Sequence, residues 1–463
     1  MIRRSATEFL ELWYGKERRK PLVLRGARQV GKSTLVRQFA LERGLILNEV
    51  NLERHLRLDD VFKTTDINTI CRELAAITGR DIKGEGRLLF LDEVQATPHA
   101  LMALRYFFEE EPDLPIIAAG SLLEFTLAEH AFSMPVGRIE YYHLYPLSFG
   151  EFVDALAPTF ARYLFELGPS SPPPAVAHQR LSELQRQFFC VGGMPEAVAD
   201  YQKNGSLAAV AEVHRAIYGT YQDDFAKYAR RNDLLLLQKV LSFIPRSLGK
   251  KIKCSAIDRE QRSAKVKEAV DLLTKARVCH KVRHSHCTGL PLYAESRDVV
   301  YKLLFMDIGL ANHVCGVDWT VINSMDAQQL VNEGGLAEQF IGQHLVNFSQ
   351  GLEAPQLHYW LREGKTANAE LDYVLSRGNS IIPVEVKSGK SGSLKSLHQF
   401  MYHKKAPLAV RFDLNPPSCQ EVAHTISTAD GSEVVQFSLI SLPLYAVGQL
   451  SRIVDEYREG TGS

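Results

Sequence analysis

The sequence predicts an α/β fold, and two observations in its first 150 residues lead to that class. Residues 22–24, 88–91 and 116–119 form short runs that are almost wholly apolar, as in strands buried on both faces of a parallel sheet. Helix-compatible stretches separate these runs. The chain has 463 residues, of which 45% are hydrophobic and 23% charged, which is ordinary for globular cores, and its length suggests about three domains.

Composition excludes several classes of protein. The 54 Lys and Arg residues balance 54 Asp and Glu residues, so there is no global basic field and any binding of nucleic acid must be local. The N-terminal residues 1–5 do not start an apolar signal segment, and no apolar run reaches the roughly 18 residues that span a bilayer. Seven cysteines without a CxxC pair argue against a disulfide framework. We therefore expect a cytoplasmic protein without a membrane association.

A glycine-rich loop follows the first apolar run. Residues 26–33 read Gly-Ala-Arg-Gln-Val-Gly-Lys-Ser, which fits GxxxxGK[ST] between a strand and the helix-compatible run 34–43. Such a loop cradles phosphates with its backbone N–H groups, while Lys32 neutralises the β- and γ-phosphates and Ser33 ligates Mg²⁺. The residues expected to contact ATP in this segment are Gly26, Ala27, Arg28, Gln29, Val30, Gly31, Lys32, Ser33 and Thr34.

Polar residues end the next two apolar runs. Asp92 and Glu93 follow the run 88–91 directly, which predicts that Asp92 supports Mg²⁺ and Glu93 polarises the attacking water. Ser121 follows the run 116–119, where its hydroxyl could sense the γ-phosphate or simply end a strand in a turn. Together with the glycine-rich loop, these residues predict a site for ATP hydrolysis.

The middle of the chain changes character after Pro146. The sequence reads as helical and is interrupted by 168–174, Gly-Pro-Ser-Ser-Pro-Pro-Pro, which cannot hold a helix. Further along, a helix at 265–277 is followed by two strand-like pieces, 278–283 and 290–294, with a turn at Thr288-Gly289. Helices followed by a small hairpin predict a winged-helix module.

The last section predicts a separate α/β unit with a metal-dependent nuclease pattern. A helix is expected at 335–348, followed by strands at 357–361, 370–375 and 381–386. Two carboxylates and a lysine on adjacent strands suit phosphodiester chemistry, since the carboxylates hold Mg²⁺ or Mn²⁺ and the lysine orients water. The expected participants are Asp372, Glu385 and Lys387, with Glu338 on the preceding helix as a further metal ligand. Cleavage and mere binding of DNA both remain open, because a fold can host no reaction.

These segments together resemble prokaryotic AAA-type ATPases that carry a C-terminal PD-(D/E)xK nuclease-like domain. The resemblance covers nearly the whole chain and also uses the segments 118–121, 135–138, 144–152, 191–196 and 305–310. It implies an arginine finger at Arg138, acting in cis or across a subunit boundary. It also implies a restriction-endonuclease-like fold for the C-terminal unit. The expected domains are an ATPase core at 1–150, a helical lid at 151–240, a winged-helix-like module at 241–320 and a nuclease-like domain at 325–450.

Two basic clusters are candidates for contact with phosphates. The first is the stretch 246–253, extended by Lys265 and Lys267, and a solvated helix end explains it equally well. The second surrounds the nuclease-like motif and consists of Lys387, Lys390, Lys395, His403, Lys404 and Lys405. The Cys and His residues between 279 and 287 match no common zinc spacing, so we expect ordinary hairpin residues there.

The function predicted from these patterns is an ATP-hydrolysing AAA-type ATPase that acts on or binds DNA as a motor or remodeller. We expect ATP and Mg²⁺ as cofactors, DNA as partner, and a homo-oligomer such as a ring. The alternative is a nucleotide-controlled signalling or scaffold ATPase, in which the nuclease-like domain is catalytically silent and the partner is a protein. Zero net charge is compatible with both functions.

Overall fold

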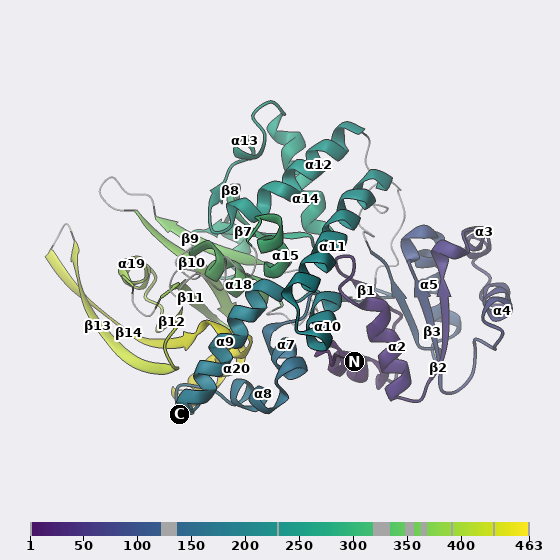
Figure 1. Ribbon diagram of the computed structural model, residues 1–463, viewed down its shortest axis with the longest axis horizontal. Coiled ribbons are helices and arrows are strands. Elements are labelled where there is room, and N and C mark those ends of the chain that lie inside the picture. Colours follow the sequence, from purple (N-terminus) through teal and green to yellow (C-terminus); the bar gives the residue numbers. More distant parts are fainter. Residues whose placement is uncertain are drawn as a thin grey trace.

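The computed structural model describes residues 2–121, 137–228, 231–317, 334–347, 356–362, 368–389, 392–428 and 431–461. Two sheets lie at opposite ends of the molecule, and long helices fill the space between them (Figure 1). The N-terminal sheet is drawn in purple at the right, and the C-terminal sheet runs from green to yellow at the left (Figure 1).

The N-terminal sheet has the strand order β2-β3-β4-β1-β5, and its strand pairs are parallel. Its central strands β1, β3 and β4 are those predicted from the apolar runs, so the α/β core with a parallel sheet is confirmed. The strands are β1 (Leu22–Arg25), β2 (Ile46–Asn51), β3 (Arg87–Asp92), β4 (Ile116–Ala119) and β5 (Glu140–His143).

Helices cover both faces of this sheet because each face presents its own set of apolar side chains. On one face, Trp13 and Phe39 pack with Leu24 and Phe90, whereas Phe107 belongs to the core on the other face. The first face is continuous with the hydrophobic core of the rest of the molecule. The helices of this region are α1 (Ala6–Tyr14), α2 (Lys32–Glu42), α3 (Leu58–Lys63), α4 (Ile67–Thr78) and α5 (His99–Glu110).

The middle of the chain is helical. Helix α9 ends at Gly192, whose φ of 68° and close approach to Asp307 leave no room for a Cβ, and α10 begins at Pro195. Within the segment 168–174, Gly168 and Ser171 form an isolated β-bridge. The helices are α7 (Phe149–Leu156), α8 (Pro158–Phe165), α9 (Ala175–Val191), α10 (Pro195–Asn204), α11 (Leu207–Tyr228) and α12 (Arg231–Phe243).

The hairpin after these helices differs from the prediction. Residues Leu292–Glu295 form a 3-10 turn, and the second strand is β8 (Ser296–Phe305), so the strand expected at 290–294 was wrong. The first strand is β7 (Cys279–Ser285), which pairs with β8 in antiparallel fashion. The preceding short elements are β6 (Lys251–Ile252), α13 (Cys254–Ile257) and α14 (Ser263–Lys275).

The hairpin is part of the C-terminal sheet, which has the order β13-β14-β12-β11-β10-β9-β7-β8-β6. Strand β7 pairs in parallel with β9, so the unit expected after residue 325 is not separate from the segment before it. The remaining elements are α15 (Ile308–Val314), α18 (Gly334–Leu345), β9 (Leu357–Arg362), β10 (Ala369–Arg377), β11 (Ser380–Val386), α19 (Lys395–Lys404), β12 (Leu408–Asp413), β13 (Ser418–Thr428), β14 (Gly431–Pro443) and α20 (Leu450–Thr461).

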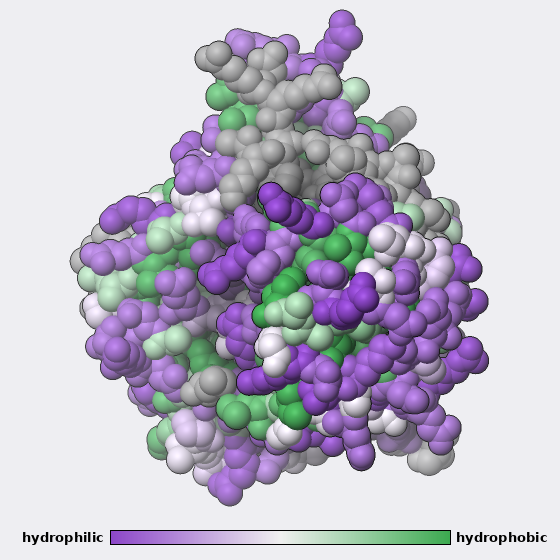
Figure 2. All heavy atoms as spheres, turned by 90° about the vertical axis from the view of Figure 1, so that its right-hand side faces the viewer, coloured by the Kyte–Doolittle hydropathy of each residue, from purple (hydrophilic) through white to green (hydrophobic). Residues whose placement is uncertain are grey.

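The surface on the N-terminal side is covered mainly by hydrophilic residues, with hydrophobic residues confined to small patches (Figure 2). Among the helices that the structure describes, none is long and apolar enough to cross a membrane.

Candidate functional site

The glycine-rich loop connects β1 to α2, and two of its glycines are required by the backbone. Gly26 has a φ of 145°, and a Cβ at this position would lie 2.1 Å from the carbonyl oxygen of Leu144. Gly31 has a φ of 92° and starts α2 in the left-handed conformation. Only glycine adopts both conformations at low cost, so the pattern GxxxxGK has a direct physical cause here.

Lys32 lies over this loop. Its ammonium donates to the carbonyl oxygens of Gly26 and Ala27 at 3.1 and 2.9 Å, and the residue is 8% exposed. The charge is therefore held beside the backbone that would surround the phosphates of a nucleotide. Gln29 and Thr34 are exposed, whereas Val30 is buried, so only part of the loop faces solvent.

Ser33 and Asp92 meet across the ends of α2 and β3. The Ser33 hydroxyl donates to Oδ2 of Asp92 at 2.8 Å. Burial raises the pKa of Asp92, and the neighbouring Glu93 carboxylate raises it further. Because a hydroxyl and carboxylates are the oxygen ligands that Mg²⁺ prefers, this donor set fits the predicted ion. A cation here would favour the charged form of Asp92.

Glu93 takes a left-handed backbone conformation, with a φ of 53°, directly after β3. Its Oε2 accepts from Nε2 of Gln95 at 2.5 Å and from the hydroxyl of Ser121 at 3.3 Å. Ser121 therefore lies at the carboxylate predicted to polarise water, at the adjoining end of β4. Sequence reasoning missed Gln95, and only its position two residues after Glu93 could have indicated that it lies near this carboxylate.

Arg138 lies away from this site. Strand β5 runs parallel to β1 with Glu140 beside Leu22, so Arg138 precedes the start of β5 while the loop follows the end of β1. The side chain is exposed, and its Nε donates to Glu109 at 3.0 Å. The prediction that Arg138 acts in cis does not fit this placement, because the sheet separates it from the loop. Action across a subunit boundary stays a prediction. The segment's Pro135 and Val136 lie outside the described residues.

Arg4 holds the glycine-rich loop from the side of α1. Its guanidinium donates to the carbonyl oxygens of Val30 at 2.9 Å and Tyr145 at 2.7 Å, and it pairs with Glu151 at 3.1 Å. Burial alone would raise the pKa of Glu151, but Arg4 and the surrounding N–H donors outweigh it and lower that pKa. Arg4 was not predicted, because no motif surrounds it.

Helix α11 contacts the same loop from the other side. The Tyr221 hydroxyl donates to the carbonyl oxygen of Arg28 at 2.7 Å, and the Arg28 side chain forms an ion pair with the buried Asp224. A helix of the predicted lid is thus bonded directly to the predicted phosphate-binding loop. Sequence reasoning missed both α11 residues, since nothing in a helical pattern identifies its long-range partner.

Three segments that carried the family resemblance meet in the interior. Gly193 donates its N–H to Asp307 at 2.6 Å, and its carbonyl oxygen accepts from the N–H of Leu147 at 2.6 Å. Asp307 also accepts from the N–H of Leu310 at 2.9 Å, and burial raises its pKa to about 6. The contacts join the end of the N-terminal domain to α10 and α15.

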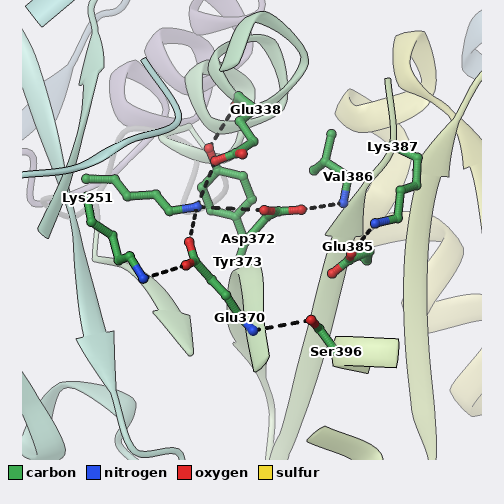
Figure 3. A network of polar contacts seen from close by, with 10 residues as sticks. Lys251, Glu338, Glu370, Asp372, Tyr373, Glu385, Val386, Lys387 and Ser396 are labelled. Atoms are coloured by element: carbon green, nitrogen blue, oxygen red, sulfur yellow. Dashed lines mark hydrogen bonds and ion pairs between the residues drawn. The ribbon is translucent and has the colours of Figure 1, made fainter. Parts of the chain in front are cut away.

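The predicted nuclease-like residues also come together, in what we call the carboxylate cluster, defined as Glu338, Glu370, Asp372 and Glu385. Glu338 from α18 and the two acidic residues of β10 converge, and Val386 donates its N–H to Asp372 at 2.8 Å (Figure 3). The Lys387 ammonium donates to Glu385, which lies two residues earlier at the end of β11. The sequence predicted three members of the cluster, Glu338, Asp372 and Glu385, together with Lys387, and it missed Glu370.

A lysine that was not predicted contacts three of the four members of the carboxylate cluster. The ammonium of Lys302, on β8, lies 2.8 Å from Glu338, 2.8 Å from Glu370 and 3.7 Å from Asp372. Lys251 on β6 pairs with Glu370 at 2.8 Å (Figure 3). Lys251 belongs to the basic stretch 246–253, so part of that stretch is paired with a carboxylate of the cluster, although the Lys251 side chain is still exposed.

Charges in the cluster shift one another strongly. Burial lowers the pKa of Lys302, but the surrounding carboxylates outweigh it and hold that pKa well above its usual value. Burial and the charge of Asp372 raise the pKa of Glu338 to about 8 and that of Glu385 to about 7. In both groups burial is the larger cause and the charge of Asp372 is the next.

The carboxylate cluster does not fit a divalent metal ion. The Lys302 ammonium already lies between Glu338, Glu370 and Asp372, and two of these three carboxylates are predicted metal ligands. Within the part of the chain that the structure describes, no group of three or more His, Cys, Asp or Glu residues is arranged to hold a metal ion. The expectation of metal ligation by Glu338, Asp372 and Glu385 is therefore not supported by the geometry.

The fold and the loop define a P-loop ATPase domain of the AAA type at the N-terminal end of the chain. A family model described as an AAA domain matches residues 18–153. Two further models, described as domains of unknown function (DUF8612 and DUF4143), match residues 182–321 and 333–427. The chain therefore carries an AAA-type domain, which supports ATPase activity, nucleotide binding and use of Mg²⁺.

Comparison with solved structures adds similar proteins at low identity. The ORC2 protein of Aeropyrum pernix, in ADPNP–ADP complexes, is 14% identical with a TM-score of 0.34, covering 70% of this chain and 94% of that one. The ORC1 protein of the same organism, in complex with DNA, is 12% identical with a TM-score of 0.26, covering 68% and 93%. At these TM-scores the likenesses support no inference about function. No curated protein matches the chain.

Proposed function

We propose that the chain hydrolyses ATP at the glycine-rich loop, with Glu93 as the residue that polarises the attacking water. One observation carries this proposal: five predicted residues meet at the carboxyl ends of the strands, where α2, β3 and β4 adjoin. They are Lys32, Ser33, Asp92, Glu93 and Ser121. Lys32 binds the phosphates, and the Ser33–Asp92 pair holds Mg²⁺. The ion supplies charge neutralisation at the phosphates when it is bound.

ATP hydrolysis by the full chain tests this proposal with two variants. Lys32→Ala should abolish turnover by weakening nucleotide binding, whereas Glu93→Gln should retain ATP binding and lose turnover by about 100-fold or more. Glu42→Gln, which also removes one carboxylate but on the far end of α2, is the matched control and should hydrolyse at the wild-type rate. Wild-type turnover in Glu93→Gln would contradict the role assigned to Glu93.

The nucleotide controls the rest of the molecule through α11. Arg28 lies in the phosphate-binding loop and is bonded on its backbone by Tyr221 and on its side chain by Asp224. A phosphate that draws the loop toward itself changes both contacts, and α11 packs on α12 and α15. The lid and the winged-helix-like segment thereby respond to the nucleotide state.

DNA is the proposed partner of this ATPase, and the exposed basic residues before and within α14 are the proposed contact. Their side chains are exposed and lie on the segment predicted to be a winged helix: Arg246, Lys250, Lys253, Lys265 and Lys267. Such residues neutralise phosphates locally, as a chain of zero net charge requires. In the second cluster, Lys387 is paired with Glu385, and Lys390 lies outside the described residues.

Fluorescence anisotropy with labelled duplex and branched DNA tests this contact. The double variant Lys250→Glu/Lys253→Glu should weaken binding of every sequence alike and reduce the dependence of affinity on salt. Lys203→Glu/Lys16→Glu, which makes the same charge change elsewhere, is the control. No binding by the wild type at low salt, together with slow hydrolysis, would favour the alternative of a signalling ATPase with a protein partner.

Self-association is proposed through Arg138. Arg138 is exposed and lies at the end of the strands opposite to the glycine-rich loop, so its side chain suits contact with the nucleotide of a neighbouring copy. Mixing Lys32→Ala with Arg138→Ala tests this arrangement, because each copy then lacks only one half of a shared site. Hydrolysis by Arg138→Ala alone at the wild-type rate would contradict it.

A further inference from the structure

Lys302 has an environment that surface lysines do not have. It lies in the interior of β8, between Val282 of β7 and Lys251 of β6, and it is 2% exposed. Its ammonium is surrounded by Glu338, Glu370 and Asp372. A lysine is almost never buried to this extent unless it is paired, so these carboxylates are what makes the burial possible.

The Lys302 ammonium cannot leave this position without losing its hydrogen-bond acceptors. Both neighbouring strands hold the backbone of Lys302 in register, and the ring of Tyr359 lies 5.7 Å from the ammonium. Glu338 is also fixed, because the Tyr373 hydroxyl donates to its backbone carbonyl oxygen at 2.8 Å. A divalent ion that displaced the ammonium would leave a buried lysine without an acceptor.

The carboxylates around Lys302 and Lys302 itself lie in segments of the chain that different family models match. Glu338, Glu370 and Asp372 belong to the segment 333–427, whereas Lys302 belongs to the preceding segment 182–321. Strand β8 of the hairpin therefore places the Lys302 ammonium among carboxylates of the segment 333–427. An ion pair of this kind also fastens the two segments to each other.

We propose that Lys302 is the resident cation of the carboxylate cluster, that it takes the place of a divalent metal ion, and that the C-terminal sheet therefore binds its partners without cleaving phosphodiesters. The inference is independent of ATP hydrolysis, because the carboxylate cluster and the glycine-rich loop share no residue. Failure of the proposed ATPase activity would leave it unaffected.

Mn²⁺ binding to the nucleotide-free full chain, followed by electron paramagnetic resonance, tests this proposal directly. The wild type and Asp372→Asn should bind equally little Mn²⁺, since the wild-type cluster has no place for the ion. The amide of Asn still accepts the N–H of Val386, so this variant keeps the local backbone contact. Asp233→Asn, which removes an exposed carboxylate on α12, is the control. Binding by the wild type that is lost in Asp372→Asn alone would overturn the proposal.

A variant without the lysine should open the cluster to metal. Lys302→Met removes the ammonium and keeps most of the side-chain volume, so Mn²⁺ should bind and should raise the melting temperature of this variant but not of the wild type. Adding Asp372→Asn to Lys302→Met should abolish both effects. If Lys302→Met does not fold, the double variant Lys302→Met/Glu338→Gln removes one buried charge of each sign. The wild-type measurement decides the proposal in either case.

DNA cleavage provides the second readout. Wild-type protein with Mg²⁺ or Mn²⁺ should leave single-stranded, duplex and branched DNA intact. Cleavage that disappears in Lys387→Ala and persists in Lys32→Ala would assign a working nuclease site to the cluster and overturn the proposal.

Discussion

The glycine-rich loop and the carboxylate cluster use the same kinds of residue and end with different chemistry. In both, a lysine lies close to acidic side chains, and in both the sequence predicts a bound metal ion. Lys32 donates to the backbone carbonyl oxygens of its own loop, so the oxygens of Asp92 and Glu93 stay available. Lys302 donates to the carboxylates themselves. The acceptor of the ammonium therefore decides whether the acidic residues can serve a metal.

The two regions also differ in what their contacts connect. The glycine-rich loop lies at the carboxyl end of β1, where Arg4 and helix α11 donate hydrogen bonds to its backbone. Both contacts lie where a bound nucleotide could displace them. The cluster joins strands inside one continuous sheet of nine. One region is suited to change state, and the other is suited to hold two segments together. The predictions below test this contrast.

The largest expected effects separate the two lysines. Lys32→Met should lose ATP hydrolysis by at least about 100-fold and leave the melting temperature almost unchanged, because its ammonium donates to backbone carbonyl oxygens of the loop. Lys302→Met should keep ATP hydrolysis and lose about 3–5 kcal/mol of unfolding free energy, since it leaves buried carboxylates without their partner. Steady-state hydrolysis and urea unfolding of both variants make the comparison. Equal loss of hydrolysis in both, at a temperature where both are folded, would contradict it.

A smaller effect should come from neutralising the surplus carboxylate. Glu338→Gln in the Lys302→Met background should recover about 1–3 kcal/mol of the lost stability, because one unpaired buried charge is removed. In the wild-type background the same change should destabilise the protein, since it removes an acceptor of Lys302. A double-mutant cycle from urea unfolding measures the coupling, and a value of zero would show that the two side chains do not interact.

The carboxylate cluster should also make stability depend on pH. The pKa of Glu338 is raised to about 8 and that of Glu385 to about 7, above the usual value of 4.5. The folded state therefore binds more protons than the unfolded state, so this contribution is present at low pH and is lost as pH rises from about 5 to 8. The loss should shrink in Glu338→Gln, because this variant no longer carries the group with the larger shift. Unfolding of both proteins at pH 5 and pH 8 checks the sign, and an identical pH dependence would refute the assignment.

The smallest effect concerns the contact between α11 and the loop. Tyr221→Phe removes the hydroxyl that donates to Arg28 and should cost about 1 kcal/mol of stability. If α11 responds to the nucleotide, the stabilisation given by bound ADP should also change in this variant. Tyr163→Phe, on α8, removes a hydroxyl that does not contact the loop and serves as control. Equal stabilisation by ADP in all three proteins would show that α11 does not sense the loop.

Much of the N-terminal site was predictable because its signals are local. The loop 26–33 and the pair Asp92-Glu93 are contiguous, and each follows a run that is apolar enough to be a buried strand. Strands β2 and β5 were missed, since they lie at the two edges of the sheet and are only partly buried, so neither forms a continuous apolar run. Strand β8 was misplaced because it opens with Ser-Arg-Asp, which hides its apolar pattern.

The sequence alone was enough to place a phosphate-binding loop, its serine and its two carboxylates, because the geometry of each depends on neighbours within a few residues. It was also enough to gather Glu338, Asp372, Glu385 and Lys387 into one region. The tertiary structure decided what occupies that region, since helix α18 packs against β8 and brings Glu338 to Lys302, a residue 36 positions earlier in the chain. A charged side chain takes its chemistry from the groups that surround it, and those groups are set by long-range pairing that no local pattern contains.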